Sequence, residues 1–207
     1  MRLIKSARDG DAEAQLAVGR LYLTGGEGLA ANPFAAATWF SRAWKCGRAE
    51  AAVYIAEGIP PPSSESNVMP LDYVSACHAA AARGSAIASF HLGELLRTGR
   101  GVAQDREAAL AAFARAAEAG HAGAARRLGE LLAEGSPVSD PDDARRWLEQ
   151  AAKRGDAAAA RRLADLLWQG RDVAAIPWLR PLAEAGEAEA MCRLGELLLA
   201  DGNQPLR

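Results

Sequence analysis

A chain of 207 residues with a net charge of -2 excludes several classes of protein. Half of its residues are hydrophobic, enough for a sizeable core, and its richness in alanine with only 6% aromatic residues favours helices over strands. It has no basic field for nucleic acid or anionic lipid, no apolar run of the ~20 residues that a membrane-spanning helix needs, and no apolar leader. Its three cysteines and three histidines form no disulfide framework or ligand cluster, so we expect no metal and no cofactor.

In chain order, a glycine follows an alanine-rich helical segment six times. These glycines are Gly10, Gly47, Gly84, Gly120, Gly155 and Gly186. Their intervals are 37, 37, 36, 35 and 31 residues, a period typical of helical repeat proteins. We therefore expect one domain, 1–207, with units at about 11–47, 48–84, 85–120, 121–155 and 156–186, and partial helices at 1–10 and 187–207.

The unit 85–120 shows the predicted pattern most clearly. Apolar residues at helical spacing predict a first helix over 86–97, and glycines at 99 and 101 end it. Asp105 is a good N-cap for a second helix, which should stop at Gly120. Each unit is thus predicted to be two helices joined by short turns, which makes the chain all-α.

Small residues recur at one position of each first helix, where a close helix approach would offset their cost of about 1 kcal/mol per glycine. The column reads Gly19, Ala56, Gly93, Gly129, Ala164 and Gly195. In the second helices two adjacent columns mix large and small residues, and we expect both to fill the core. They read Trp39, Ala76, Ala112, Trp147 and Trp178, and then Phe40, Cys77, Phe113, Leu148 and Leu179.

Three segments depart from the pattern. The first helix of the second unit, 48–58, leads into a proline-rich segment, 59–70, which we expect to be an irregular loop that is either a tolerated surface feature or a contact for a partner. The glycine-rich segment 25–28 is expected to be a turn between helices rather than a phosphate site. The last loop is shortened to 169–172.

These residues resemble the Sel-like repeat family, which is related to tetratricopeptide repeats. In the unit 85–120 the residues that carry the resemblance are Ala88, Leu92, Gly93, Gly99, Gly101, Val102, Asp105, Ala109, Ala116, Ala117 and Gly120. The next unit repeats the pattern with Leu128, Gly129, Gly135, Asp140, Ala144, Trp147, Ala151, Ala152 and Gly155. The resemblance implies a right-handed α/α superhelical solenoid of about five helix pairs with a concave face, lined by the first helices.

On that face we expect a groove that binds another protein or a peptide. Its apolar anchors would be Phe90, which lies on this face, and Trp168, because tryptophan is frequent at binding hot spots. Its polar residues would be Glu94, Arg97, Arg126, Glu130, Arg161 and Asp165. One column of this face is mostly acidic and reads Arg20, Glu57, Glu94, Glu130, Asp165 and Glu196. It is either a ladder for a basic partner or a solvated face on which Arg126 pairs with Glu130, and Arg161 with Asp165, four residues apart.

The resemblance implies a non-enzymatic adaptor, and no catalytic motif contradicts it. Two alternatives stay open: a bacterial immunity protein that neutralises a secreted toxin, and a component of envelope or exopolysaccharide assembly. We expect a monomer that binds neither nucleic acid nor membrane. The abundance of alanine and arginine suggests a bacterial source, with the cytoplasm and the periplasm both open.

Overall fold

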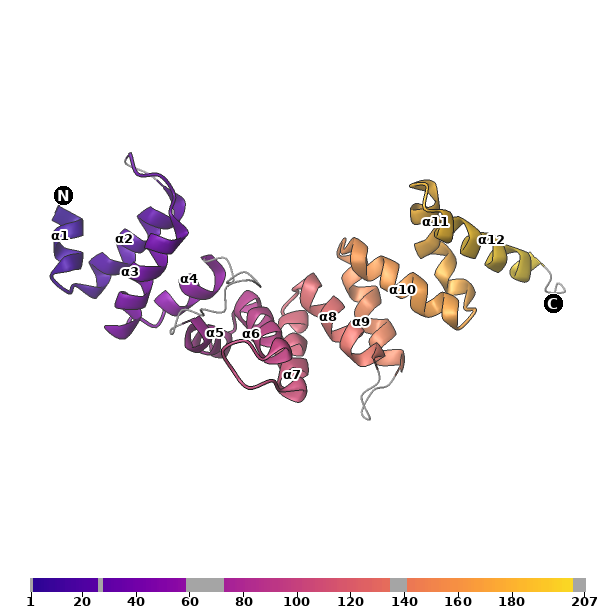
Figure 1. Ribbon diagram of the computed structural model, residues 1–207, viewed down its shortest axis with the longest axis horizontal. Coiled ribbons are helices and arrows are strands. Elements are labelled where there is room, and N and C mark those ends of the chain that lie inside the picture. Colours follow the sequence, from indigo (N-terminus) through magenta and orange to yellow (C-terminus); the bar gives the residue numbers. More distant parts are fainter. Residues whose placement is uncertain (1, 26–27, 59–72, 135–140, 203–207) are drawn as a thin grey trace. The chain divides into compact units, whose positions relative to one another are not determined.

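The computed structural model describes residues 2–25, 28–58, 73–134 and 141–202, and this part of the chain is built from helices and turns (Figure 1). The helices are α1 (Arg2–Arg8), α2 (Ala12–Thr24), α3 (Pro33–Lys45), α4 (Ala51–Gly58), α5 (Tyr73–Ala82), α6 (Ala86–Thr98), α7 (Arg106–Glu118), α8 (Ala122–Ala133), α9 (Pro141–Lys153), α10 (Ala157–Gln169), the short 3-10 helix η1 (Val173–Ala175), α11 (Ile176–Glu184) and α12 (Ala188–Gly202). The prediction of an all-α repeat protein is confirmed. The predicted loop 59–70 lies outside the described residues, as do residues 26 and 27 of the glycine-rich turn.

The recurring glycines end the helices for a reason of backbone geometry. At all six, φ lies between 88° and 99°, a region that strains residues with a side chain. After α7, the Gly120 N–H donates to the oxygen of Ala117 and the His121 N–H donates to that of Ala116. These two bonds satisfy carbonyls that the end of a helix leaves open. The glycine period therefore marks the turns between repeats, as predicted.

After three of these glycines, the next residue also caps the following helix. The Asp156 N–H donates to the oxygen of Ala151 in α9, while its carboxylate accepts from the Ala159 N–H at the start of α10. Asp11 and Ser85 act in the same two ways before α2 and α6. One short dipeptide thus closes one helix and caps the next.

The helix α4 starts later than predicted. We expected it from Arg48, but it begins at Ala51. Arg48 holds the position that Asp11 and Ser85 hold elsewhere, and its side chain carries only donors, so it cannot accept from the N–H groups of a first turn.

Within a repeat, the small residue of the first helix receives a large side chain from the second. A Cβ added at Gly93 would lie 2.6 Å from the Phe113 ring, and one added at Gly19 would lie 2.5 Å from Phe40. The close approach predicted from this column is observed at Gly19, Gly93 and Gly129, whereas nothing lies within 4 Å of a Cβ added at Gly195. Of the two core columns, the second is fully buried, whereas the tryptophans of the first, such as Trp39, are only half-buried.

The chain divides into two compact units, Met1–His121 with α1 to α7 and Ala122–Arg207 with α8 to α12. The division falls one residue after Gly120, where a boundary between repeats was expected. That the whole chain forms one domain stays a prediction.

Candidate functional site

The eight predicted contact residues lie on the first helices of three repeats. Phe90, Glu94 and Arg97 belong to α6 in the first unit. The other five belong to α8 and α10 in the second unit, and they are Arg126, Glu130, Arg161, Asp165 and Trp168. The predicted contact residues therefore form two sets, one on each unit.

The Phe90 ring packs against other aromatic side chains of its own unit. It stacks on the His121 imidazole, with ring centroids 4.5 Å apart and an angle of 19° between the planes, and it lies 5.9 Å from the Phe113 ring. Burial lowers the pKa of His121, which favours the neutral form of the imidazole. Phe90 is half-buried, and much of its apolar surface serves packing between repeats.

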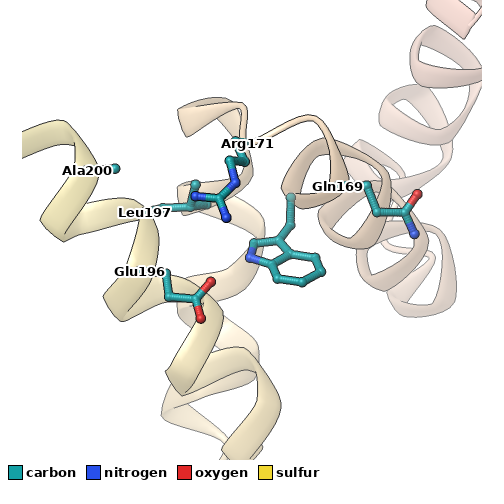
Figure 2. A pocket seen from close by; sticks show the side chains of 6 residues that line it. Gln169, Arg171, Glu196, Leu197 and Ala200 are labelled. Atoms are coloured by element: carbon teal, nitrogen blue, oxygen red, sulfur yellow. The ribbon is translucent and has the colours of Figure 1, made fainter.

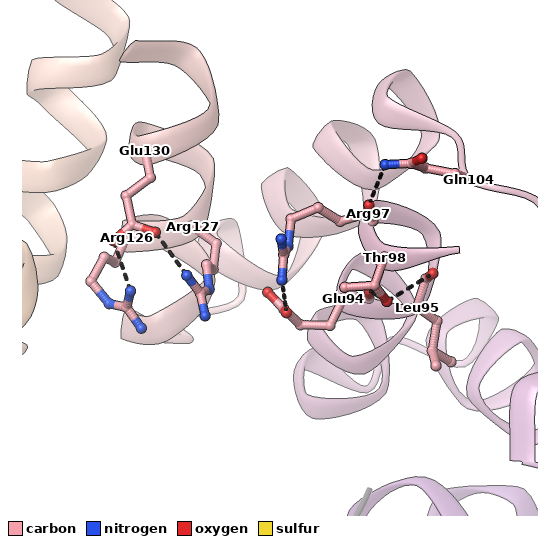
Figure 3. A network of polar contacts seen from close by, with 8 residues as sticks. All are labelled: Glu94, Leu95, Arg97, Thr98, Gln104, Arg126, Arg127 and Glu130. Atoms are coloured by element: carbon pink, nitrogen blue, oxygen red, sulfur yellow. Dashed lines mark hydrogen bonds and ion pairs between the residues drawn. The ribbon is translucent and has the colours of Figure 1, made fainter. Parts of the chain in front are cut away.

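The other two predicted residues of α6 pair with each other (Figure 3). The Arg97 Nη2 donates to the Glu94 Oε2 over 2.7 Å, across one helical turn. The backbone oxygen of Arg97 accepts from the Gln104 Nε2 over 2.8 Å, which fastens the end of α6 to the following loop. Both charged side chains are about one-third exposed or less.

In the second unit, Arg126 holds the register position that Phe90 holds in the first. Its Nη1 donates to the Glu130 Oε1 over 2.8 Å, and its Nε donates to the Asp156 Oδ2 over 3.1 Å. Arg127 also donates to Glu130, over 3.0 Å (Figure 3). Burial alone would lower the pKa of Arg126, but the two carboxylates outweigh it and raise this pKa. The predicted pair of Arg126 and Glu130 is confirmed.

The predicted pair of Arg161 and Asp165 is wrong. Arg161 donates to Glu187, and Asp165 accepts from Arg193 of α12. Both partners come from the next repeat. A neighbouring helix thus offers each residue a partner that competes with the one on its own helix, which sequence spacing alone does not reveal.

Three predicted residues follow a common rule. Phe90, Arg126 and Arg161 each reach the residue just before the next first helix. Those residues are His121, Asp156 and Glu187. We call these three contacts the inter-repeat clasps. Each of these three predicted contact residues therefore already has a partner within the chain.

All but one of the side chains in the acidic column have a polar partner. Glu94 and Glu130 pair with arginines of their own helices, and Asp165 pairs with Arg193. At the remaining earlier positions, Glu57 accepts from the Ser85 hydroxyl, and Arg20 lies 4.0 Å from Glu50. Among the described members of the column, Glu196 alone has a side chain without a polar partner.

Glu196 lies at a pocket that also contains Trp168 (Figure 2). The pocket has a cavity volume of about 110 Å³ and is lined by Trp168, Gln169, Arg171, Glu196, Leu197 and Ala200. We call it the Trp168 pocket. The Arg193 guanidinium lies over the indole, 4.5 Å from the ring centroid, and its bonds to Asp165 and Glu189 hold it there. The predicted anchor Trp168 is therefore half-buried and held in place beside an opening.

Three residues at or beside this pocket were not predicted as contacts from the sequence: Arg171, Glu196 and Arg193. Glu196 was visible in the acidic column, but the column alone did not show which of its members lack partners. Arg193 follows Arg127 and Arg162 at one register position, a recurrence that could have marked it. Arg171 carries no sequence signal that we recognise.

Neither a metal centre nor a membrane span is found within the described ranges. No group of three or more His, Cys, Asp or Glu side chains there could hold a metal ion. No helix in the same part of the chain is both long and apolar enough to cross a bilayer.

Comparison with known proteins identifies the repeats. The sequence matches the Sel1 repeat at residues 12–47, 86–121, 122–156, 157–186 and 188–205. A protective antigen present in uropathogenic Escherichia coli strains, which displays an SLR fold, is 27% identical with a TM-score of 0.69. The match covers 95% of this chain and 43% of that one, so this chain spans less than half its length.

A Sel1 repeat protein from Oxalobacter formigenes is 26% identical with a TM-score of 0.60, and the match covers 91% of this chain and 78% of that one. None of the curated proteins matches the sequence. Sel1 repeat proteins are in general modules for protein–protein interaction. With matches to this repeat over more than half of its residues, the chain belongs to the Sel1 repeat family.

Proposed function

We propose that this chain is a non-catalytic adaptor that binds a partner protein through the first helices of its repeats, with the Trp168 pocket as its main contact. One observation carries the proposal: a tryptophan held in a fixed position stands beside polar side chains that the fold does not use. Tryptophan and arginine dominate binding energy at protein interfaces, and side chains held in place lose little entropy on binding.

Three side chains with shifted pKa values support a non-catalytic role. Burial raises the pKa of the Cys77 thiol to about 12 and also raises the pKa of the Tyr73 hydroxyl, so neither forms a nucleophilic anion at neutral pH. Burial also lowers the pKa of His91, whose Nδ1 lies 2.8 Å from the oxygen of Ala56. All three lie inside the first unit and not at the Trp168 pocket.

The test is site-specific crosslinking in the cells that produce the protein. A photo-crosslinking amino acid at Gln169, which lines the pocket, should capture one protein that mass spectrometry identifies. The same amino acid at Arg180, exposed on α11 away from the pocket, is the matched control.

Purified partner and chain are then compared by calorimetry. We expect Trp168→Ala to weaken binding by about 30-fold, the loss of about 2 kcal/mol that defines a hot spot. Trp147→Ala, a half-buried tryptophan of α9, should change affinity little. Equal capture at both sites, or unchanged affinity of the Trp168 variant, would contradict the proposal. The identity of the captured protein distinguishes an adaptor from an immunity protein or an envelope component.

A further inference from the structure

The polar side chains around the Trp168 pocket are free for a ligand. Arg171 and Gln169 are exposed, and neither side chain has a hydrogen bond or an ion pair with the described residues. Glu196 is likewise exposed and without a polar partner. Several other charged residues of α10 and α12 are paired within the chain, as Arg161 is with Glu187 and Asp165 is with Arg193. The pocket thus keeps one positive and one negative charge available.

The backbone at Arg171 is strained, and this residue lines the pocket. Arg171 has a φ of 50°, the one positive value among the described residues other than glycine. Its N–H donates to Trp168 over 2.8 Å, and that of Asp172 donates to Leu167 over 2.9 Å, the same turn that uses glycine at the other helix ends. A side chain in this conformation costs about 1–2 kcal/mol. Glycine would suit the fold better, so the arginine points to a role in binding.

The size of the cavity limits the ligand. Sites for small molecules and cofactors usually enclose about 300–1,000 Å³. A volume of about 110 Å³ fits a single side chain of a larger partner. Arg171 extends from the loop after α10 and Glu196 extends from α12, and the two side chains line the same opening (Figure 2).

We propose that the Trp168 pocket binds a partner segment in which an arginine stands next to an aspartate or a glutamate. The ligand guanidinium would pair with Glu196 and contact the indole, because a planar cation both stacks on aromatic rings and bonds to carboxylates. The neighbouring ligand carboxylate would pair with Arg171, whose guanidinium can donate two parallel hydrogen bonds to a carboxylate. The proposal rests on the proposed function and specifies the chemistry of the partner.

The test uses the intact chain labelled with ¹⁵N and a set of capped Gly-Ser peptides. Indole N–H signals report each of the five tryptophans, and the signal of Trp168 is the one missing from Trp168→Phe. The peptides carry Arg-Asp, Arg-Ser, Ser-Asp or Ser-Ser at their centre. We expect the Arg-Asp peptide to shift the Trp168 signal saturably with a Kd on the order of 1 mM, as such a small contact allows. It should bind at least fivefold tighter than the others.

Two variants separate binding from folding. Arg171→Gly should keep or raise the melting temperature because it relieves the backbone strain. It should nevertheless lower the affinity for the Arg-Asp peptide at least fivefold. Glu196→Gln should weaken it similarly. Arg180→Ala and Glu184→Gln, exposed on α11, are the matched controls and should bind as the wild type does.

Three outcomes would overturn the inference: no saturable shift with the Arg-Asp peptide, equal binding of the Ser-Ser peptide, or unchanged binding by both pocket variants. A shift that free acetate reproduces at the same concentration would show a simple anion site and would overturn it too. If the peptides fail but Trp168→Ala weakens the crosslinked partner, the adaptor function stands and only this assignment of the ligand is rejected.

Discussion

The two units build the same repeat junction from different chemistry. In the first unit the column that ends at Phe90 is apolar, with Leu16 and Val53 before it, and its clasp is an aromatic stack on His121. In the second unit the column continues with Arg126 and Arg161, and the clasps are ion pairs with Asp156 and Glu187. Backbone turns, caps and glycine packing are alike on both sides, so the repeat framework does not dictate what fills this position.

Because of this difference, we expect the stability of the two units to respond differently to salt concentration. Apolar contacts depend little on ionic strength, whereas partly exposed ion pairs are screened by salt. Because both kinds of clasp occupy one register position, substitutions there compare the two directly.

The largest effect is expected from Phe90→Ala in the first unit. Losing a half-buried ring from a stack should lower the free energy of unfolding by about 2 kcal/mol, below the 3–5 kcal/mol of a fully buried phenylalanine. Urea unfolding curves in 0.05 M and 1 M NaCl should give the same loss. The control is Phe34→Ala, whose side chain is 76% exposed and should cost almost nothing. A loss that falls by half in high salt would show that the two clasps do not differ as described.

A smaller effect is expected from Arg126→Ala in the second unit. Its side chain is 20% exposed and joins Glu130 and Asp156, so we expect a loss of about 1 kcal/mol, between the values for surface and buried pairs. This loss should shrink by about half in 1 M NaCl, where the Debye length is about 3 Å. Arg146→Ala, which breaks a more exposed pair with Asp143, is the control and should cost less than about 0.5 kcal/mol. A loss that salt does not change would contradict the contrast.

The smallest effect is expected from mild acid, and it should appear in the first unit. Burial lowers the pKa of His91 and of His121 in the folded state. Below about pH 6.5 the unfolded chain therefore binds protons that the folded chain does not, so stability falls as the pH falls. Hydrogen exchange, corrected for its intrinsic rate, should show α6 opening more at pH 5.5 than at pH 7, with α10 changing less. His121→Asn should reduce this increase in the opening of α6. The control is His78→Gln, which replaces an exposed histidine and should not change the increase.

The repeat framework was predictable because its causes are local in sequence. Gly120 requires a positive φ, Asp105 offers an acceptor to a first turn, and Gly93 leaves room for Phe113. Each of these follows from the residue type and its place in the period. The late start of α4 was missed because the period hid the loss of an acceptor at Arg48.

The candidate site was predictable only in part. Trp168 was selected from its register, and it lies at a pocket. The partners of Arg161 and Asp165 were not predictable, because a residue from the next repeat competes with the one on the same helix. The availability of Glu196 follows only from knowing every other pairing in its column. Whether the eight predicted residues bind a partner stays a prediction.

The dipeptide that closes one helix and caps the next has a consequence for how such chains lengthen. The pair Gly155-Asp156 both ends α9 and caps α10. A segment that is copied from one such pair to the next therefore includes the residues that form both of its junctions. A duplicated unit would need no new turn, and its contacts would be with neighbours in sequence. Gene duplication at this boundary can therefore add a repeat without damaging the repeats on either side, while the clasp and pocket residues remain free to diverge.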